Sequence, residues 1–225
     1  MPNGEKAALI IPAYNEAARI GAVIDAAQHA SGQLALTDQV IVVDNNSTDN
    51  TAGLAAEAGA IVVGCTEQGK APAMARGAEV ARNIGAGLLT FLDADLVNIT
   101  GDHVDQLILP VQAGEATMTI GYLGERRELI KRLVYKRWGM FAGPRCLPVE
   151  VWDQLSEHDL HGFRAEAALN SLFRNSGRGD EIERIELDGV SHVGKFDKYP
   201  LGLALKQYFK IEASALRGLL TSLSL

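Results

Sequence analysis

The sequence predicts an α/β fold with a mostly parallel β-sheet. Three short apolar runs predict strands at residues 8–11, 40–44 and 87–91, and each run gives way to polar residues. Segments with the apolar spacing of helices lie between these runs. Strands that alternate with helices form parallel sheets, whose ligands bind beyond the carboxyl ends of the strands. We therefore expect a ligand site where these strands end.

The first helix is predicted between the first two strands. Pro12 stops the first strand, and Asn15 is a suitable N-cap residue for the helix. Residues 17–30 repeat apolar side chains at the spacing of a helix that buries one face. This apolar stripe consists of Ile20, Val23, Ile24 and Ala27.

Two further helices follow in the first half of the chain. A polar turn at residues 45–51 leads into a helix that extends to about Ala58. Lys70 opens the next helix, at residues 71–84. The helix dipole disfavours a cation at this end of a helix. Lys70 is therefore either a solvated surface lysine or the partner of an anionic group such as a diphosphate.

The second half of the chain has a less regular pattern. Strands are predicted at residues 117–122 and 182–187. Residues 125–138 predict a basic helix, whose Lys and Arg side chains either face solvent or meet an anionic acceptor or membrane surface. Residues 199–225 predict an amphipathic helix. It packs on its own domain or on the partner subunit of a homodimer, or it lies on a membrane surface.

Two carboxylates stand one residue apart at the end of the strand at residues 87–91. Alternate residues of an extended segment point the same way, so Asp93 and Asp95 can converge on one point. A hard divalent cation takes oxygen ligands, and Mg²⁺ usually completes its shell with substrate phosphates. The pair therefore predicts a metal site, with a turn and helix cap as the alternative.

The composition indicates one globular domain without nucleic-acid partners. The chain has 225 residues, 47% of them hydrophobic, which is enough for one substantial core. A net charge of −7 argues against a nucleic-acid partner. Cys65 and Cys146 lack metal-ligand spacing and suggest reduced thiols. With neither a signal-peptide pattern nor an apolar run of transmembrane length, we expect a cytoplasmic protein, at most peripheral at a membrane.

Four motifs together resemble family 2 glycosyltransferases with the GT-A fold, which is Rossmann-like. Their order and spacing match over roughly the first hundred residues. They are residues 11–16 (IPAYNE), 42–49 (VVDNNSTD), 69–70 (GK) and 93–95 (DAD). The resemblance implies a single GT-A domain over residues 1–225. Within it we expect a nucleotide-sugar-binding half (1–98), an acceptor half (99–198) and a C-terminal amphipathic helix (199–225).

The same resemblance implies the donor-binding residues. The nucleoside pocket would be formed by Pro12, Tyr14, Glu16 and Asp44. Lys70, Asp93 and Ala94 would lie along the rest of the nucleotide sugar, and Asp93 and Asp95 would bind Mg²⁺ or Mn²⁺.

Three features bear on the base of the donor. Asp44 can accept a hydrogen bond from a base N–H. Tyr14 offers a flat face for stacking, unless it packs in the core. Asn45 stands where many relatives carry a second aspartate, which leaves the base preference open.

On the acceptor side the resemblance is thinner. Residues 142–145 resemble a segment beside the sugar and acceptor, which places Arg145 there. Glu166 follows a glycine-aromatic segment and is the candidate catalytic contact to the acceptor hydroxyl, with a surface glutamate paired with arginine as the alternative. His192 matches by position the histidine that is a third metal ligand in glucosyl-3-phosphoglycerate synthases, unless its role is structural.

The predicted function is transfer of a sugar from a UDP- or GDP-linked donor to an unidentified acceptor, which is anionic or lipid-linked. The basic helix favours a polyprenyl phosphate, and His192 favours a phosphoglycerate-type acceptor. A catalytically inactive nucleotide-sugar-binding module is the alternative. A dinucleotide-binding oxidoreductase is disfavoured because the turn after the first strand lacks G-x-G-x-x-G.

Overall fold

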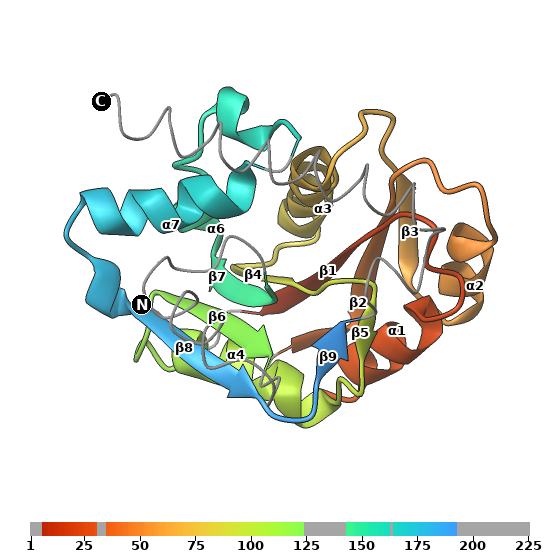
Figure 1. Ribbon diagram of the computed structural model, residues 1–225, viewed down its shortest axis with the longest axis horizontal. Coiled ribbons are helices and arrows are strands. Elements are labelled where there is room, and N and C mark those ends of the chain that lie inside the picture. The colour runs from red at the N-terminus through yellow and green to blue at the C-terminus, as the bar shows by residue number, and fades with distance from the viewer. Residues whose placement is uncertain (1–5, 31–34, 124–142, 163, 193–225) are drawn as a thin grey trace, which may run out of the picture.

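The computed structural model describes residues 6–30, 35–123, 143–162 and 164–192. The helices predicted at residues 125–138 and 199–225 lie outside the described residues. One central sheet carries helices on both faces (Figure 1). In the described part of the chain, no helix is long and apolar enough to cross a membrane.

The central sheet has seven strands in the order β3-β2-β1-β4-β7-β6-β8. Their bounds are β1 Ala7–Ala13, β2 Ala35–Asp44, β3 Ile61–Gly64, β4 Leu88–Phe91, β6 Met118–Leu123, β7 Arg145–Pro148 and β8 Ile182–Leu187. Strand β7 runs antiparallel to β4 and β6, and the other pairs are parallel. The predicted mostly parallel α/β sheet is confirmed.

Helices cover both faces because the strands are apolar on each side. The described helices are α1 Ile20–Gln28, α2 Thr51–Glu57, α3 Lys70–Asn83, α4 Gly101–Gln112, α6 Val149–Trp152 and α7 Ala165–Asn175, with 3-10 turns η1 Glu157–Leu160 and η2 Gly179–Glu181. Helices α1, α2 and α4 pack on one face, and α3, α6 and α7 pack on the other (Figure 1). The parallel strands β1, β2 and β4 therefore end between two helical layers, where the sequence predicts the site.

The start of α1 differs from the prediction. The four apolar residues of the stripe are buried as expected, but the helix begins at Ile20 and Asn15 does not cap it. Asn15 has a positive φ of 55°, and its side chain accepts a hydrogen bond from the backbone N–H of Thr48 at 2.7 Å. Its own N–H donates to Ser47 Oγ at 3.0 Å. Asn15 therefore joins the turns after β1 and β2.

A second sheet, absent from the sequence prediction, lies beside the end of β4. Its two strands, β5 (Leu96–Val97) and β9 (Ser191–His192), pair antiparallel, with Leu96 opposite His192. Strands this short have no readable pattern. Their pairing brings a segment from near the end of the described chain to the Asp93–Asp95 turn.

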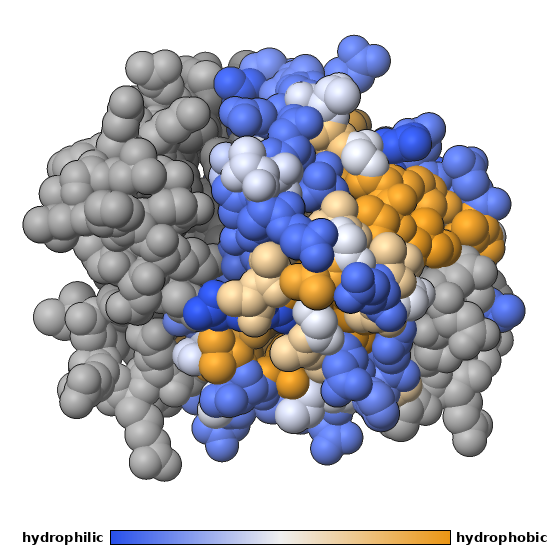
Figure 2. Space-filling model, turned by 90° about the vertical axis from the view of Figure 1, so that its right-hand side faces the viewer, coloured by the Kyte–Doolittle hydropathy of each residue, from blue (hydrophilic) through white to orange (hydrophobic). Residues whose placement is uncertain are grey.

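Strand β3 forms one edge of the central sheet, and Ile61, Val62 and Val63 are only partly buried. Figure 2 views the molecule from the side on which β3 lies in Figure 1, and apolar surface gathers there beside hydrophilic residues. An edge strand leaves backbone groups and side chains partly uncovered, as the partial burial of Ile61, Val62 and Val63 shows.

Candidate functional site

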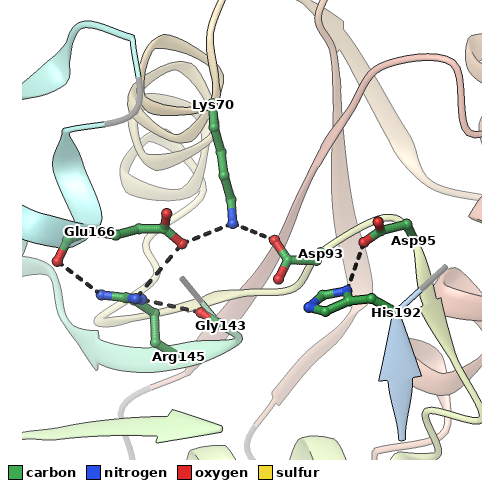
Figure 3. A network of polar contacts seen from close by, with 7 residues as sticks. All are labelled: Lys70, Asp93, Asp95, Gly143, Arg145, Glu166 and His192. Atoms are coloured by element: carbon green, nitrogen blue, oxygen red, sulfur yellow. Dashed lines mark hydrogen bonds and ion pairs between the residues drawn. The ribbon is translucent and has the colours of Figure 1, made fainter. Parts of the chain in front are cut away.

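Four charged side chains from four different elements meet beyond the end of β4 (Figure 3). Lys70 begins α3, Asp93 follows β4, Arg145 begins β7, and Glu166 lies in the first turn of α7. The chain folds so that both halves of the predicted domain contribute to one cluster.

Lys70 connects the two carboxylates of this cluster. Its ammonium donates hydrogen bonds to Asp93 and, at 2.8 Å, to Glu166 Oε1. Burial on its own would lower the pKa of Lys70, but the charges and hydrogen bonds of Asp93 and Glu166 outweigh it and raise the pKa. The alternative of a solvated surface lysine is therefore wrong, because two carboxylates hold this cation at the helix start.

Glu166 lies between two cations. Its side chain is 5% exposed, and Arg145 Nη2 lies 3.7 Å from Oε1. The alternative, a surface glutamate paired with arginine, is wrong about the surface because Glu166 is buried, but the pairing with an arginine is present. The structure thus places Glu166 inside the cluster, with Lys70 on one side and Arg145 on the other.

Arg145 is fully buried at the start of β7. Its Nε donates to the Gly143 carbonyl at 3.3 Å, and Nη1 donates to the Glu166 carbonyl at 3.4 Å. Burial lowers the pKa of its guanidinium, opposed by the charges of Glu166 and Asp93. In this structure the guanidinium therefore faces Glu166 and backbone carbonyls rather than an open surface.

Asp95 and His192 form a second pair beside the cluster. His192 Nδ1 lies 3.1 Å from Asp95 Oδ1, and the two side chains are 39% and 25% exposed. Burial would lower the pKa of His192, but the hydrogen bond to Asp95 and the charges of Asp93 and Asp95 raise it. The pairing of β9 with β5 brings His192 to this position, 97 residues after Asp95.

The donor atoms of this region suit a hard divalent cation in kind. Two carboxylates and an imidazole are ligands that Mg²⁺ or Mn²⁺ accepts, the rest of the shell coming from substrate oxygens. Among the described residues, no group of three His, Cys, Asp or Glu side chains is spaced to hold a metal ion by itself. Asp93 instead contacts Lys70, and Asp95 contacts His192.

The predicted nucleoside residues lie at the ends of β1 and β2. Asp44 closes β2, and its Oδ1 is buried without a hydrogen-bond partner among the described residues. Tyr14 is 41% exposed, so it does not pack in the core. The Glu16 backbone N–H donates to Thr51 Oγ1 at 2.8 Å, which ties this segment to α2. Pro12 lies within β1, and Ala94 is buried between the two aspartates.

Asn45 is a residue whose role the sequence did not predict. Its side chain is buried, and Nδ2 donates to the carbonyls of Cys65 and Glu67 at 3.1 and 2.6 Å. Its Oδ1 accepts from the Gly69 N–H at 2.8 Å. An aspartate could not donate to two carbonyls. In the sequence, the only sign of this role was that Asn45 replaces the aspartate of many relatives. In the structure, Asn45 fixes the loop before Lys70.

Gly69 allows this loop to approach the start of α7. Its φ is 142°, and a Cβ at this position would lie 2.8 Å from the Gly162 carbonyl oxygen. The Ala71 N–H donates to that same carbonyl at 2.9 Å. The close backbone contact sets the separation between Lys70 and Glu166. A cavity of about 460 Å³ near this loop lies between residues 64–67, α3 and η1, and none of the predicted site residues lines it.

Curated relatives match part of the chain. Glucosyl-3-phosphoglycerate synthases from Mycobacterium tuberculosis (strain CDC 1551 / Oshkosh) and Mycolicibacterium paratuberculosis are both 32% identical, over 123 and 120 residues. The matches cover 52% and 50% of this chain, but only 37% and 35% of the relatives. The chain thus spans little more than a third of the length of these relatives.

Solved structures share the fold over more of the chain. A crystal structure of the Mycobacterium tuberculosis glucosyl-3-phosphoglycerate synthase with Mn²⁺, UDP and glucosyl-3-phosphoglycerate has a TM-score of 0.79 at 24% identity, covering 97% of this chain and 80% of that one. A second, with Mn²⁺, UDP-glucose and phosphoglyceric acid, has a TM-score of 0.71 at 26% identity, covering 84% and 72%. The predicted GT-A fold is confirmed by these likenesses.

The family assignment rests on the longest sequence match. Residues 8–154 match Glycosyl transferase family 2, and this segment contains the four motifs together with Arg145. Because the match extends over more than half of its length, the chain belongs to glycosyl transferase family 2.

Proposed function

We propose that this protein transfers a sugar from a nucleoside-diphosphate sugar to an acceptor hydroxyl, with Mg²⁺ or Mn²⁺. One observation carries the proposal. Lys70, Asp93, Asp95 and His192 gather where β4 ends (Figure 3). Strand β2, on the other side of β1, ends in Asp44, whose buried Oδ1 has no hydrogen-bond partner among the described residues. Side chains that can bind a metal ion, a lysine and a carboxylate that can bind a base thus lie at the carboxyl ends of parallel strands. This arrangement suits a nucleoside diphosphate with its metal ion.

The nucleoside would bind at the ends of β1 and β2. The exposed ring of Tyr14 provides a stacking face for the base, with Pro12 and Glu16 beside it. The buried Oδ1 of Asp44 lacks a described partner, and a base N–H would satisfy it. We favour a uridine donor because the neighbouring solved structures contain UDP or UDP-glucose.

Asp95 and His192, with Asp93, would hold the metal ion, and diphosphate oxygens would complete its shell. When bound, the metal stabilises the negative charge that develops on the departing nucleoside diphosphate. Lys70 would add a second positive charge on the same side. Asp93, which contacts Lys70 in this structure, would serve both Lys70 and the metal ion.

Glu166 would act on the acceptor. An ionised carboxylate held by Lys70 and Arg145 can accept a hydrogen bond from the acceptor hydroxyl and orient it toward the donor sugar. Arg145 is fully buried, so it would act on the acceptor indirectly, by holding Glu166 in place. In this proposal residues 1–98 bind the donor, and residues 99–198 bind the acceptor.

For the acceptor we favour a small anionic molecule of the phosphoglycerate type. Its support is the activity named for the curated relatives and the phosphoglycerate present in the neighbouring structures. A polyprenyl phosphate is the second candidate, and its support, the basic helix at residues 125–138, lies outside the described residues. The first acceptor implies a reaction in the cytoplasm, and the second adds contact with a membrane surface.

A donor-turnover assay tests the proposal. Purified protein is incubated with UDP-glucose, 3-phosphoglycerate and Mn²⁺, and released UDP is measured, with GDP-glucose and EDTA as parallel conditions. We expect UDP release that requires both the acceptor and the metal. Nucleotide binding without turnover on any acceptor would indicate the inactive binding module, and absence of Mn²⁺-dependent nucleotide binding would contradict the proposal.

A further inference from the structure

The turn between β8 and β9 is tied to the start of α4. Asn98 Nδ2 donates to the Gly189 carbonyl at 3.3 Å, and His103 Nε2 lies 3.1 Å from the Asp188 carbonyl oxygen. Asn98 and His103 follow β5, whereas Asp188 and Gly189 lead into β9. The two segments that carry Asp95 and His192 are thus fastened together at their far ends.

The contacts of His103 determine which of its nitrogens carries the proton. The Thr100 backbone N–H donates to His103 Nδ1 at 3.2 Å, so this nitrogen is an acceptor. Nε2 then carries the hydrogen and donates it to the Asp188 carbonyl. A neutral imidazole therefore performs two tasks. It completes the capping box of α4 with Thr100, and it binds the β8–β9 turn.

Among the described residues, β9 is held by few other contacts, namely the buried side chain of Val190, the Asn98–Gly189 bond and the contact of His192 with Asp95. It is two residues long, and among the described strands it pairs only with β5, itself two residues long. So short a pairing is marginal without further contacts. The Asp188 carbonyl is four residues before His192, so a bond at Asp188 limits where the imidazole of His192 can lie.

We infer that His103 is a positioning residue, which holds the β8–β9 turn against α4 and thereby keeps His192 beside Asp95. The metal-binding consequence rests on the proposed function, in which His192 and Asp95 hold the cation. The inference that His103 holds β9 in place does not rest on the proposed function. Outer contacts that orient metal ligands typically change metal affinity by about 10–100-fold.

Three substitutions separate the two tasks of His103. His103→Ala loses both the cap and the bond to Asp188. In His103→Glu, the carboxylate replaces the cap, as glutamate does in a capping box, but cannot donate to the Asp188 carbonyl. His103→Gln keeps an acceptor for Thr100 and an amide donor for Asp188, and is the conservative variant.

The first measurement needs no metal. Hydrogen exchange, followed by mass spectrometry, reports the protection of the backbone amides in residues 188–192. We expect this segment to exchange at least about ten times faster in His103→Glu and His103→Ala, while the helix residues 104–112 stay protected in His103→Glu. His103→Gln should exchange like the wild type. A segment 188–192 as protected in His103→Glu as in the wild type overturns the inference.

The second measurement is Mn²⁺ affinity in the presence of UDP, by titration calorimetry. We expect about tenfold weaker Mn²⁺ binding by His103→Glu and near wild-type binding by His103→Gln. The added negative charge would by itself favour a cation, so a weaker affinity cannot come from charge. Wild-type affinity in His103→Glu overturns the positioning role. If the wild type itself binds no Mn²⁺ with UDP, the proposed function fails, and the exchange measurement still decides whether His103 holds β9.

Discussion

The ammonium of Lys70 lies 2.8 Å from the carboxylate of Glu166, a residue 96 positions later in the chain. This contact joins the donor half of the proposed domain to the acceptor half. Because Lys70 also binds Asp93, one side chain links the predicted metal-binding turn to the predicted acceptor contact. A shift of Asp93 would therefore move Lys70 and, through it, Glu166.

Removing the Lys70 charge should destabilise the fold as well as abolish transfer. Lys70→Met leaves Asp93 and Glu166 without their shared partner, and an unsatisfied buried polar group costs about 1–3 kcal/mol. Urea unfolding at pH 7 measures the free energy of unfolding. Arg76→Ala is the control on the same helix, because its exposed i, i+3 pair with Glu79 should contribute only about 0.2–0.5 kcal/mol. Equal losses in the two variants would contradict the role of Lys70.

Asp95 should matter for the metal and little for the fold. Its side chain is 25% exposed and contacts His192, so Asp95→Ala should unfold near the wild-type urea concentration. Mn²⁺-dependent binding of UDP, measured by calorimetry, should be lost, because the proposed site would lack one of its two carboxylates. Full Mn²⁺-dependent binding by the Asp95→Ala protein would remove the metal assignment.

Asp44 should contribute to nucleotide binding without contributing to folding. Its buried Oδ1 has no described partner, so Asp44→Ala should leave the free energy of unfolding unchanged or raise it. Loss of one base contact worth about 1.4 kcal/mol corresponds to about tenfold weaker binding. UDP and UDP-glucose should lose affinity equally in parallel titrations. A loss confined to UDP-glucose would instead place Asp44 beside the sugar.

The sequence predicted five strands of the central sheet and the residues at its carboxyl edge, but it missed the edge strand β3 and the antiparallel strand β7. Apolar runs that end in Asp44 and in Asp93–Asp95 are local patterns, and the parallel topology brings their ends together. The family resemblance added Lys70 and Glu166. Neither pattern nor resemblance predicted that these two would pair, since the contact depends on the packing of α3 against the segment before α7.

Short strands and long-range contacts account for further features that the sequence did not predict. Strands β5 and β9 are too short for a periodic pattern, so His192 could be assigned only by its position in the chain. Asn15 has the residue type of an N-cap, but it bonds to the turn after β2. The choice between these uses of one side chain is made by a tertiary contact, which a local pattern does not contain.

Acid titration should reveal the contribution of Glu181, a carboxylate away from the site that pairs with Arg178 and accepts a hydrogen bond from Thr117 where β6 and β8 begin. Arg178 donates to both carboxylate oxygens of Glu181 at 2.7 Å, and Thr117 donates to Oε2 at 2.6 Å. These hydrogen bonds, above all those from Arg178, lower the pKa of Glu181 from 4.5 to about 2. Thr117 and Glu181 immediately precede β6 and β8, so the contact lies where this parallel pair begins.

The sign of the pH effect follows from the lowered pKa. A carboxyl group with a lower pKa in the folded state stabilises the fold at pH values above its unfolded pKa. That contribution is lost as the pH falls from 4.5 toward about 2. Urea unfolding at pH 7, 4.5 and 3 should therefore show Glu181→Gln less stable than the wild type at pH 7, with the difference shrinking at each step. Glu183→Gln, at an exposed position of the same strand, controls for the change in net charge. A difference between wild type and Glu181→Gln that stays constant from pH 7 to pH 3 would mean that the ionised carboxylate does not stabilise the fold.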